Sequence, residues 1–189
     1  MQIPIQNIYF LLCYAWDKLD EKNVVNINAS DYNSLLDLFS KVLINGTSYL
    51  LKRGFDRDYK LKEDTVSGVK GKMNISETIK NNLLVKKKTL CQFDEFDYDI
   101  IHNQIVKTTL EKILRTKDVD ETLKHQIWVL LKRLPYIQSI HLTSSIYKKV
   151  RLHRNNRFYN FLLNVCQIIN ENLQVNEKSG EFKFIEFDK

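Results

Sequence analysis

Apolar residues recur at helical spacing in the first fifty positions of the chain. The first run follows Pro4 and consists of Ile8, Leu11, Leu12, Ala15 and Leu19. This spacing predicts a helix of about 13 residues, and the aromatic side chains within it predict that it is buried on nearly all sides. A polar linker at 20–30 separates it from a second amphipathic helix, which Ser30 and Asp31 are expected to cap and Gly54 to end.

The apolar pattern changes to a period of two after Gly54. Within 55–62 and within 69–75, mostly apolar side chains at every second position alternate with charged or polar side chains. This alternation predicts two strands. The polar stretch EDTVS between them predicts that they pair as a hairpin spanning 54–75. Ser76 is expected to cap a short helix after this hairpin, and KKKTLCQFDEF is expected to contain a third strand.

Helical spacing returns from Asp97 onward. Three amphipathic runs fill 97–175, and Pro135 is expected to end the second of them. The final stretch, EFKFIEFDK, predicts a strand without a later partner, so we expect that a further segment follows it. The predicted fold class is α+β: a single domain over 1–189 with a mostly helical body and a small antiparallel sheet or projecting hairpin.

The composition is that of a folded globular protein. The chain has 189 residues, 43% of them hydrophobic, a net charge of +6 and a pI of about 9.1. The positive charge favours an acidic partner, although a solvated basic surface explains it equally well. No run of 18 apolar residues and no secretory signal are present, so we expect a cytoplasmic protein without a membrane contact. The three separated cysteines are interpreted as reduced thiols.

Sequence motifs for catalysis are weak. The stretch GVKGKMN lacks the glycine spacing and the Ser/Thr of a phosphate-binding loop. Acid-x-Lys pairs occur at Asp20, Asp58 and Glu181, but this composition produces roughly 2 to 3 such pairs by chance. The four histidines have no neighbouring nucleophile pattern and no metal-ligand spacing, and His102 is interpreted as a surface or half-buried histidine. We therefore expect no catalytic residue and no metal site in this chain.

Five collinear stretches resemble one protein family. They are IPIQNIYFLLCYAWDKL, KRGFDRDY with SGVKGKMN and TIK, FDEFDYDIIHNQIVKTTL, KRLPYIQSIHLT, and NRFYNFLLNVCQII. Together they cover nearly the whole chain and resemble the N-terminal half of McrC, a subunit of the McrBC modified-cytosine restriction systems. The resemblance implies a partner, the AAA+ GTPase ring of McrB, whose GTP hydrolysis McrC stimulates, with GTP and magnesium bound in that partner. It also implies a finger that enters the pore of the ring, and DNA as the target of the whole complex.

The resemblance also shows a departure. In the family a PD-(D/E)xK nuclease domain follows the region similar to EFKFIEFDK, whereas this sequence stops at Lys189. We therefore expect either a portion of a longer protein or a naturally short form, which does not cleave DNA alone. The target site, the modified base and the stoichiometry with the ring do not follow from the sequence.

The basic, glycine-rich stretch 52–74 is the predicted finger. It holds three of the five glycines, and glycine permits the tight turns and close backbone approaches that a slim projecting hairpin needs. The residues expected to contact acidic or carbonyl-lined loops of the ring are Arg53, Lys60, Lys62, Lys70, Gly71 and Lys72. The linker at 20–30 is an alternative finger. Equally, Gly68 and Gly71 could serve an ordinary bulged hairpin with solvated lysines.

Two rival functions remain open. The first is an independent nucleic-acid-binding module, whose phosphate contacts are Lys148, Lys149, Arg151, Arg154 and Arg157. Against it, Arg157 and Phe158 also fit the first turn of an ordinary helix. The second is a minimal metal-dependent nuclease using Glu181 and Lys183. Asn103 matches a recurrent asparagine of the family, and a hydrogen bond that anchors a helix explains it as well as catalysis does.

Overall fold

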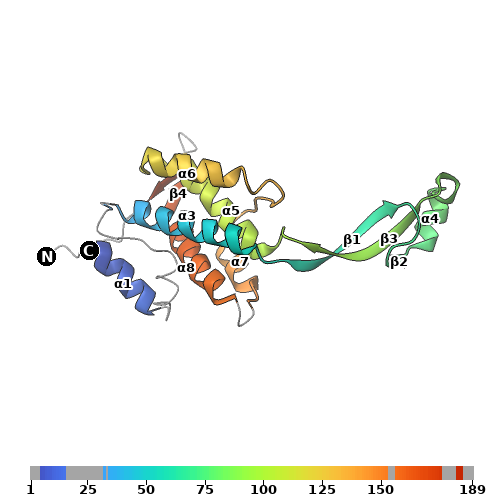
Figure 1. Ribbon diagram of the computed structural model, residues 1–189, viewed down its shortest axis with the longest axis horizontal. Helices are drawn as coiled ribbons and strands as arrows, with labels where there is room; N and C mark the ends of the chain where they lie inside the picture. The colour runs from blue at the N-terminus through green and yellow to red at the C-terminus, as the bar shows by residue number, and fades with distance from the viewer. Residues whose placement is uncertain (1–4, 16–31, 33, 153–155, 176–181, 185–189) are drawn as a thin grey trace. The chain divides into compact units, whose positions relative to one another are not determined.

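The computed structural model describes residues 5–15, 32, 34–152, 156–175 and 182–184 of the chain. It divides into two compact units (Figure 1). The helical unit comprises Met1–Phe55 and Ile101–Lys189, and the ribbon unit comprises Asp56–Ile100. The linker at 20–30, the residues Ser30 and Asp31, and Arg154 lie outside the described residues.

The helical unit is built around three long helices, α3 (Leu35–Arg53), α5 (Ile101–Leu114) and α8 (Arg157–Asn172). Helix α6 (Glu121–Leu131) packs on α3 and α5, and α7 (Ser144–Lys149) packs on α8. The remaining elements are α1 (Ile5–Ala15) and the antiparallel pair β4 (Leu173–Val175) and β5 (Phe182–Phe184). None of the described helices is long and apolar enough to span a bilayer.

The core of the helical unit comes from the apolar stripes that the sequence shows. Its fully buried side chains include Phe39, Leu43, Val106, Leu110, Ile113, Leu162, Val165 and Ile169. Each helix contributes residues three or four positions apart, which lie on one face of a helix. The predicted helical body is therefore confirmed.

The ends of helix α3 follow local signals. Gly54 has φ = 101°, and its N–H donates to the carbonyl of Leu50, so the predicted C-terminal stop is confirmed. The helix begins at Leu35 with Ser34 as N-cap, four residues later than predicted. Leu35 and Leu36 are buried and directly follow Ser34, whose side chain forms no capping hydrogen bond, so burial of the apolar stripe accounts for this start better than a side-chain cap does.

The ribbon unit is a three-stranded antiparallel sheet in the order β1-β3-β2. Strand β1 (Asp58–Val66) pairs along its whole length with β3 (Thr89–Asp97), and β2 (Lys72–Met73) pairs with the other edge of β3. At about 3.3 Å per residue, nine residues make a ribbon about 30 Å long. The third strand predicted from KKKTLCQFDEF is confirmed.

The predicted hairpin of 55–62 with 69–75 is wrong. The stretch EDTVS is not a turn: Glu63–Val66 continue strand β1, and the chain turns afterwards through Gly68 and Gly71, both with positive φ. A nine-residue ladder with β3 satisfies more backbone groups than the short hairpin would. Strand β3 therefore lies between the two segments that were expected to pair.

A short helix ends the ribbon beyond β2. Helix α4 (Ile75–Lys80) is capped by Asn74, whose side chain accepts a hydrogen bond from the Glu77 N–H at 3.2 Å, and the 3-10 helix η2 (Leu84–Lys86) follows. The predicted cap Ser76 is wrong, because Ser76 lies inside α4. Thr78 fixes α4 to the sheet, since its hydroxyl accepts from the Leu90 N–H at 3.0 Å. We call the segment 74–88 the tip of the ribbon (Figure 1).

Candidate partner-docking surface

The two faces of strand β1 have different chemistry. Alternate side chains of a strand point to opposite faces, so Lys60 and Lys62 share one face, and Tyr59 and Leu61 share the other. The sequence predicted this alternation correctly. The partners of both faces come from strand β3 and from the residues directly after it.

Acidic side chains neutralise the lysines of the charged face. Lys60 Nζ lies 2.9 Å from Asp99 Oδ2, and Lys62 Nζ lies 2.9 Å from Glu95 Oε2. The hydrogen bond and the charge of Glu95 raise the pKa of the Lys62 amino group, which therefore stays protonated at neutral pH. The Lys62–Glu95 pair links β1 to β3, and the Lys60–Asp99 pair links β1 to the segment that follows β3.

The segment 70–72 packs closely on strand β3. Lys70 Nζ lies 3.7 Å from the centroid of the Phe93 ring, a cation–π contact. Gly71 has φ = 68°, and a side-chain carbon added there would lie 2.5 Å from the carbonyl oxygen of Gln92. Lys72 is exposed beside a groove that also contains Glu63, Met73, Asn74, Ile75 and Gln92. In the described part of the chain Lys72 forms no ion pair.

The ribbon unit carries no net charge. Residues 56–100 contain nine Lys or Arg and nine Asp or Glu side chains. Positive and negative side chains lie next to each other in this unit. A partner that approaches it therefore meets a surface that is neutral as a whole but carries individual charged groups. Long-range attraction by positive charge, which the composition suggested, does not come from this unit.

The opposite face of the ribbon exposes aromatic and apolar side chains that the sequence reasoning missed. Tyr59 is 70% exposed and Phe96 is 52% exposed, and their ring centroids are 5.0 Å apart across the β1–β3 pair. Leu61 is also exposed, and Arg57 lies 3.8 Å from the centroid of the Tyr98 ring. The period-two pattern identified this face, but a sequence pattern does not show whether another layer covers it. We call Tyr59, Leu61 and Phe96 the aromatic face.

The tip of the ribbon also exposes apolar side chains. Ile75 and Ile79 are four residues apart on α4, so they lie on the same side of the helix, and both are more than half exposed. Val85, at 86% exposed, and Leu84 follow in the 3-10 helix, next to Lys86, Lys87 and Lys88. Exposed apolar side chains grouped in this way are typical of surfaces that contact another macromolecule.

Arg53 lies in the other unit, in the last turn of α3, where its Nη1 donates to the Tyr49 hydroxyl at 3.5 Å. The structure therefore brings together Lys60, Lys62, Lys70, Gly71 and Lys72 in one unit and leaves Arg53 in the helical unit.

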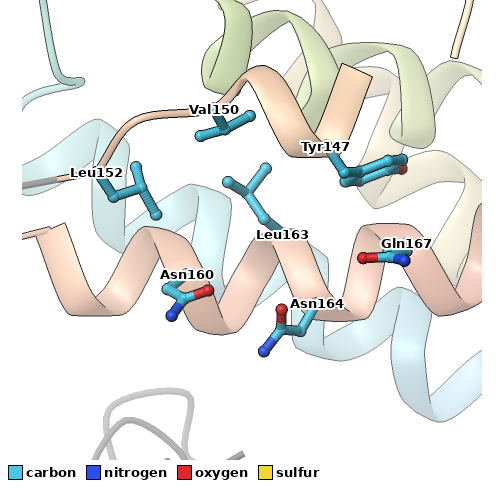
Figure 2. A pocket seen from close by; sticks show the side chains of 7 residues that line it. All are labelled: Tyr147, Val150, Leu152, Asn160, Leu163, Asn164 and Gln167. Carbon is cyan, nitrogen blue, oxygen red and sulfur yellow. The ribbon is translucent and has the colours of Figure 1, made fainter. Parts of the chain in front are cut away.

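The second predicted basic stretch surrounds helix α7. Lys148 and Lys149 are in the last turn of α7, Arg151 follows it, and Arg157 begins α8. A groove between these elements is lined by side chains of α7, of 150–152 and of α8 (Figure 2). The carboxylate of the alternative nuclease, Glu181, and the side chain of Lys183 lie outside the described residues.

Asn103 and His102 are structural residues of the helical core. Asn103 is fully buried, and its Oδ1 accepts a hydrogen bond of 2.8 Å from the Tyr159 hydroxyl, which links α5 to α8. The His102 ring contacts the Tyr159 ring edge-on at 4.7 Å between centroids, and His102 is buried rather than at the surface. The anchoring hydrogen bond, one of the two explanations that the sequence left open for Asn103, is therefore present.

Residues 6–187 match the family model of the McrBC 5-methylcytosine restriction system component. A curated relative, the type IV methyl-directed restriction enzyme EcoKMcrBC of Escherichia coli (strain K12), is 32% identical over 187 residues. The match covers 99% of this chain and 54% of that relative. The chain therefore spans about half the length of the curated relative it matches.

Two solved structures share the fold. One is the cryo-EM structure of the Thermococcus gammatolerans McrBC complex, with a TM-score of 0.62 and 18% identity, covering 80% of this chain and 48% of that chain. The other is the half-complex from the tetradecameric assembly of Thermococcus gammatolerans McrB AAA+ hexamers with bound McrC. Its TM-score is 0.60 at 17% identity, covering 73% of this chain and 33% of that chain.

Proposed function

The chain belongs to the McrBC 5-methylcytosine restriction system component family, and from this premise we propose that it is the ring-docking part of an McrC-like subunit. Its partner is an McrB-like AAA+ GTPase ring, and its action is to stimulate GTP hydrolysis by that ring. DNA is contacted through the full complex. The observation that carries the proposal is the ribbon unit, a narrow and separate sheet within a chain that matches the family along nearly its whole length.

The solved structures support the choice of partner. One of the two with the same fold is a complex of McrB AAA+ hexamers with bound McrC. A ring pore admits only a slim element, and the two long strands of the ribbon are accompanied only by the short strand β2 and the short helices α4 and η2. The ribbon unit is therefore the element that we propose to enter the pore.

The structure divides the proposed contact residues into two groups. Lys60 and Lys62 are already paired with carboxylates, so we propose that they mainly keep the ribbon in shape. Lys70 and Lys72, together with the close turn at Gly71, are the charged contacts that reach a pore loop. The aromatic face of Tyr59, Leu61 and Phe96 supplies the apolar contact, because exposed aromatic residues contribute most to interfaces.

The proposed mechanism is a shift in population of the ring. A ligand shifts an equilibrium only by its difference in affinity for the two states. The ribbon therefore binds more tightly when the pore-facing loops are in the arrangement that hydrolyses GTP. GTP and magnesium are bound by the ring, and this chain contributes contacts rather than a catalytic group.

The test is steady-state GTP hydrolysis by an McrB-like protein, titrated with this chain. We expect saturable stimulation. The variants Lys70→Glu/Lys72→Glu and Tyr59→Ser/Phe96→Ser should each raise the half-maximal concentration at least about tenfold, as loss of central interface contacts does. A matched control is Lys148→Glu/Lys149→Glu, which changes the charge equally in the other unit and should leave the titration unchanged.

A circular dichroism spectrum shows whether each variant is folded. Stimulation that survives both ribbon variants would move the docking contact out of the ribbon unit. Absence of stimulation by the folded wild-type chain would contradict the proposed function.

A further inference from the structure

The positive charge of the chain lies in one segment of the helical unit. Residues 121–172, which include α6, α7 and α8, contain eight Lys or Arg side chains and two Glu side chains. The ribbon unit is neutral over 56–100, and the chain as a whole has a net charge of +6. The net positive charge of the chain therefore belongs to the helical unit and not to the ribbon unit that we propose to enter the ring.

The α7–α8 groove lies within this segment (Figure 2). It has a volume of about 250 Å³ and is lined by Tyr147, Val150, Leu152, Asn160, Leu163, Asn164 and Gln167. Val150 and Leu152 form one wall, and α8 forms the other. The groove is open to solvent and not a closed cavity inside the core, since Asn160 is exposed and Asn164 is half-buried.

Side-chain amides line the α8 wall of the groove. Asn160, Asn164 and Gln167 are four and three residues apart, so they lie along one face of the helix. Gln167 Nε2 donates to Glu171 Oε1 at 2.8 Å, which orients its amide. Tyr147 also lines the groove, but its hydroxyl oxygen is buried, and burial raises the pKa of its phenol.

Four cationic residues are neighbours in sequence of the residues that line the groove. Lys148 and Lys149 follow Tyr147 on α7, Arg151 lies between the wall residues Val150 and Leu152, and Arg157 is three residues before Asn160. Within the described residues all four are exposed and form no ion pair. In this they differ from Lys60 and Lys62 of the ribbon, which have carboxylate partners.

We propose that the α7–α8 groove binds a single strand of nucleic acid. Lys148, Lys149, Arg151 and Arg157 neutralise phosphates, because Lys and Arg contacts to phosphate dominate such affinities. The amides of Asn160 and Asn164 pair with base edges, since an amide offers both a donor and an acceptor to an unpaired base. A groove of this size holds a base or two, whereas a duplex would touch only its rim. This site does not depend on ring docking.

The experiment is fluorescence anisotropy of a labelled single-stranded oligonucleotide of about 20 nucleotides, titrated with the full chain and no GTPase. With four neutralised phosphates and a slope of about −0.7 for each, the logarithm of the binding constant should fall with the logarithm of salt with a slope of about −3. Lys148→Glu/Lys149→Glu should weaken binding by more than about tenfold and make that slope shallower.

The neutral variant Asn160→Ala/Asn164→Ala separates a groove from a general basic surface. Because it removes no charge, it should weaken binding by about threefold to tenfold and leave the salt slope unchanged. Lys86→Glu/Lys88→Glu, which changes equal charge at the tip of the ribbon, is the matched control and should change affinity by less than about twofold.

The absence of binding at about 50 mM salt would overturn the proposal. Equal loss of affinity in the tip control, or full affinity in the asparagine variant, would also overturn it. Displacement of the oligonucleotide by polyglutamate as efficiently as by unlabelled DNA would also overturn it, because the surface would then bind any polyanion. If unlabelled duplex DNA competed better than unlabelled single-stranded DNA, the groove would not be a site for a single strand.

Discussion

Lys60 and Asp99 form an ion pair at the end of the ribbon where the chain enters and leaves that unit. Lys60 Nζ is 2.9 Å from Asp99 Oδ2, and the Asp99 side chain is only 9% exposed, against 41% for Lys60. The backbone N–H of Asp99 donates to Asp97 Oδ1 at 3.1 Å. The largely buried Asp99 carboxylate is therefore in direct contact with the Lys60 cation.

Replacing Lys60 should loosen the end of the ribbon. In Lys60→Met the buried Asp99 carboxylate loses this cation, so we expect the ribbon to lose about 1 kcal/mol of stability, a value reduced for the exposure of Lys60. Amide hydrogen exchange across β1 and β3 measures this. Lys62→Met is the control, since the Lys62–Glu95 pair is about half exposed at both ends and should change exchange by less. Equal effects of both variants would contradict the special role of Asp99.

Gly71→Ala should separate β2 from β3. The new methyl group would lie 2.5 Å from the Gln92 carbonyl oxygen, and the backbone has φ = 68°. We expect a local loss of about 2–3 kcal/mol, measured as faster amide exchange at Lys72 and Met73. Gly68→Ala is the control with positive φ but open space around the glycine, and should cost about 1 kcal/mol. Unchanged exchange in Gly71→Ala would show that the close approach is absent in solution.

The buried hydrogen bond between Tyr159 and Asn103 should contribute to the stability of the helical unit. Tyr159→Phe leaves the buried Asn103 Oδ1 without this donor and should lower the free energy of unfolding by about 1–2 kcal/mol. Urea denaturation measures the change. In a double-mutant cycle with Asn103→Ala, the coupling should be at least about 0.5 kcal/mol. Additive losses would mean that the two side chains do not interact.

The stability of the helical unit should decrease above pH 9 because of Cys166. Burial raises the pKa of its thiol from 9.0 to about 12, so the folded state keeps the proton that the unfolded state loses. The contribution is fully present below pH 9 and is lost as the pH rises towards 12. Over this range the free energy of unfolding falls by up to about 1.4 kcal/mol per pH unit.

Comparison with Cys166→Ala tests this pH dependence. The variant should be less stable than the wild type at pH 8, because removing the buried thiol leaves a small cavity. Its free energy of unfolding, measured by urea denaturation from pH 8 to 10, should fall less steeply. The buried tyrosines are present in both proteins, so their contributions to the pH dependence cancel when the two profiles are subtracted. Parallel pH profiles would contradict the assignment to Cys166.

Particular residues show how much of the structure can be predicted from the sequence. Gly54 was recognised as a helix stop, because a glycine after an amphipathic run is a local signal that needs no tertiary context. The cap of α4 was misplaced from Asn74 to Ser76, because both residue types cap helices and only the three-dimensional path of the chain selects one. The candidate lysines of the ribbon were found, but not their partners Asp99 and Glu95, which lie more than thirty residues away.

The sequence by itself determined the long helices, the three strands of the ribbon and the family, because these depend on local periodicity and on collinear motifs, whereas the short helix α7 was not predicted. Only the tertiary structure decided that β1 pairs with β3, which lysines are neutralised, and that Tyr59 and Phe96 are exposed. The physical reason is that strand pairing and burial depend on residues distant in sequence. A period of two defines two faces of a strand, but the rest of the fold determines what covers each face.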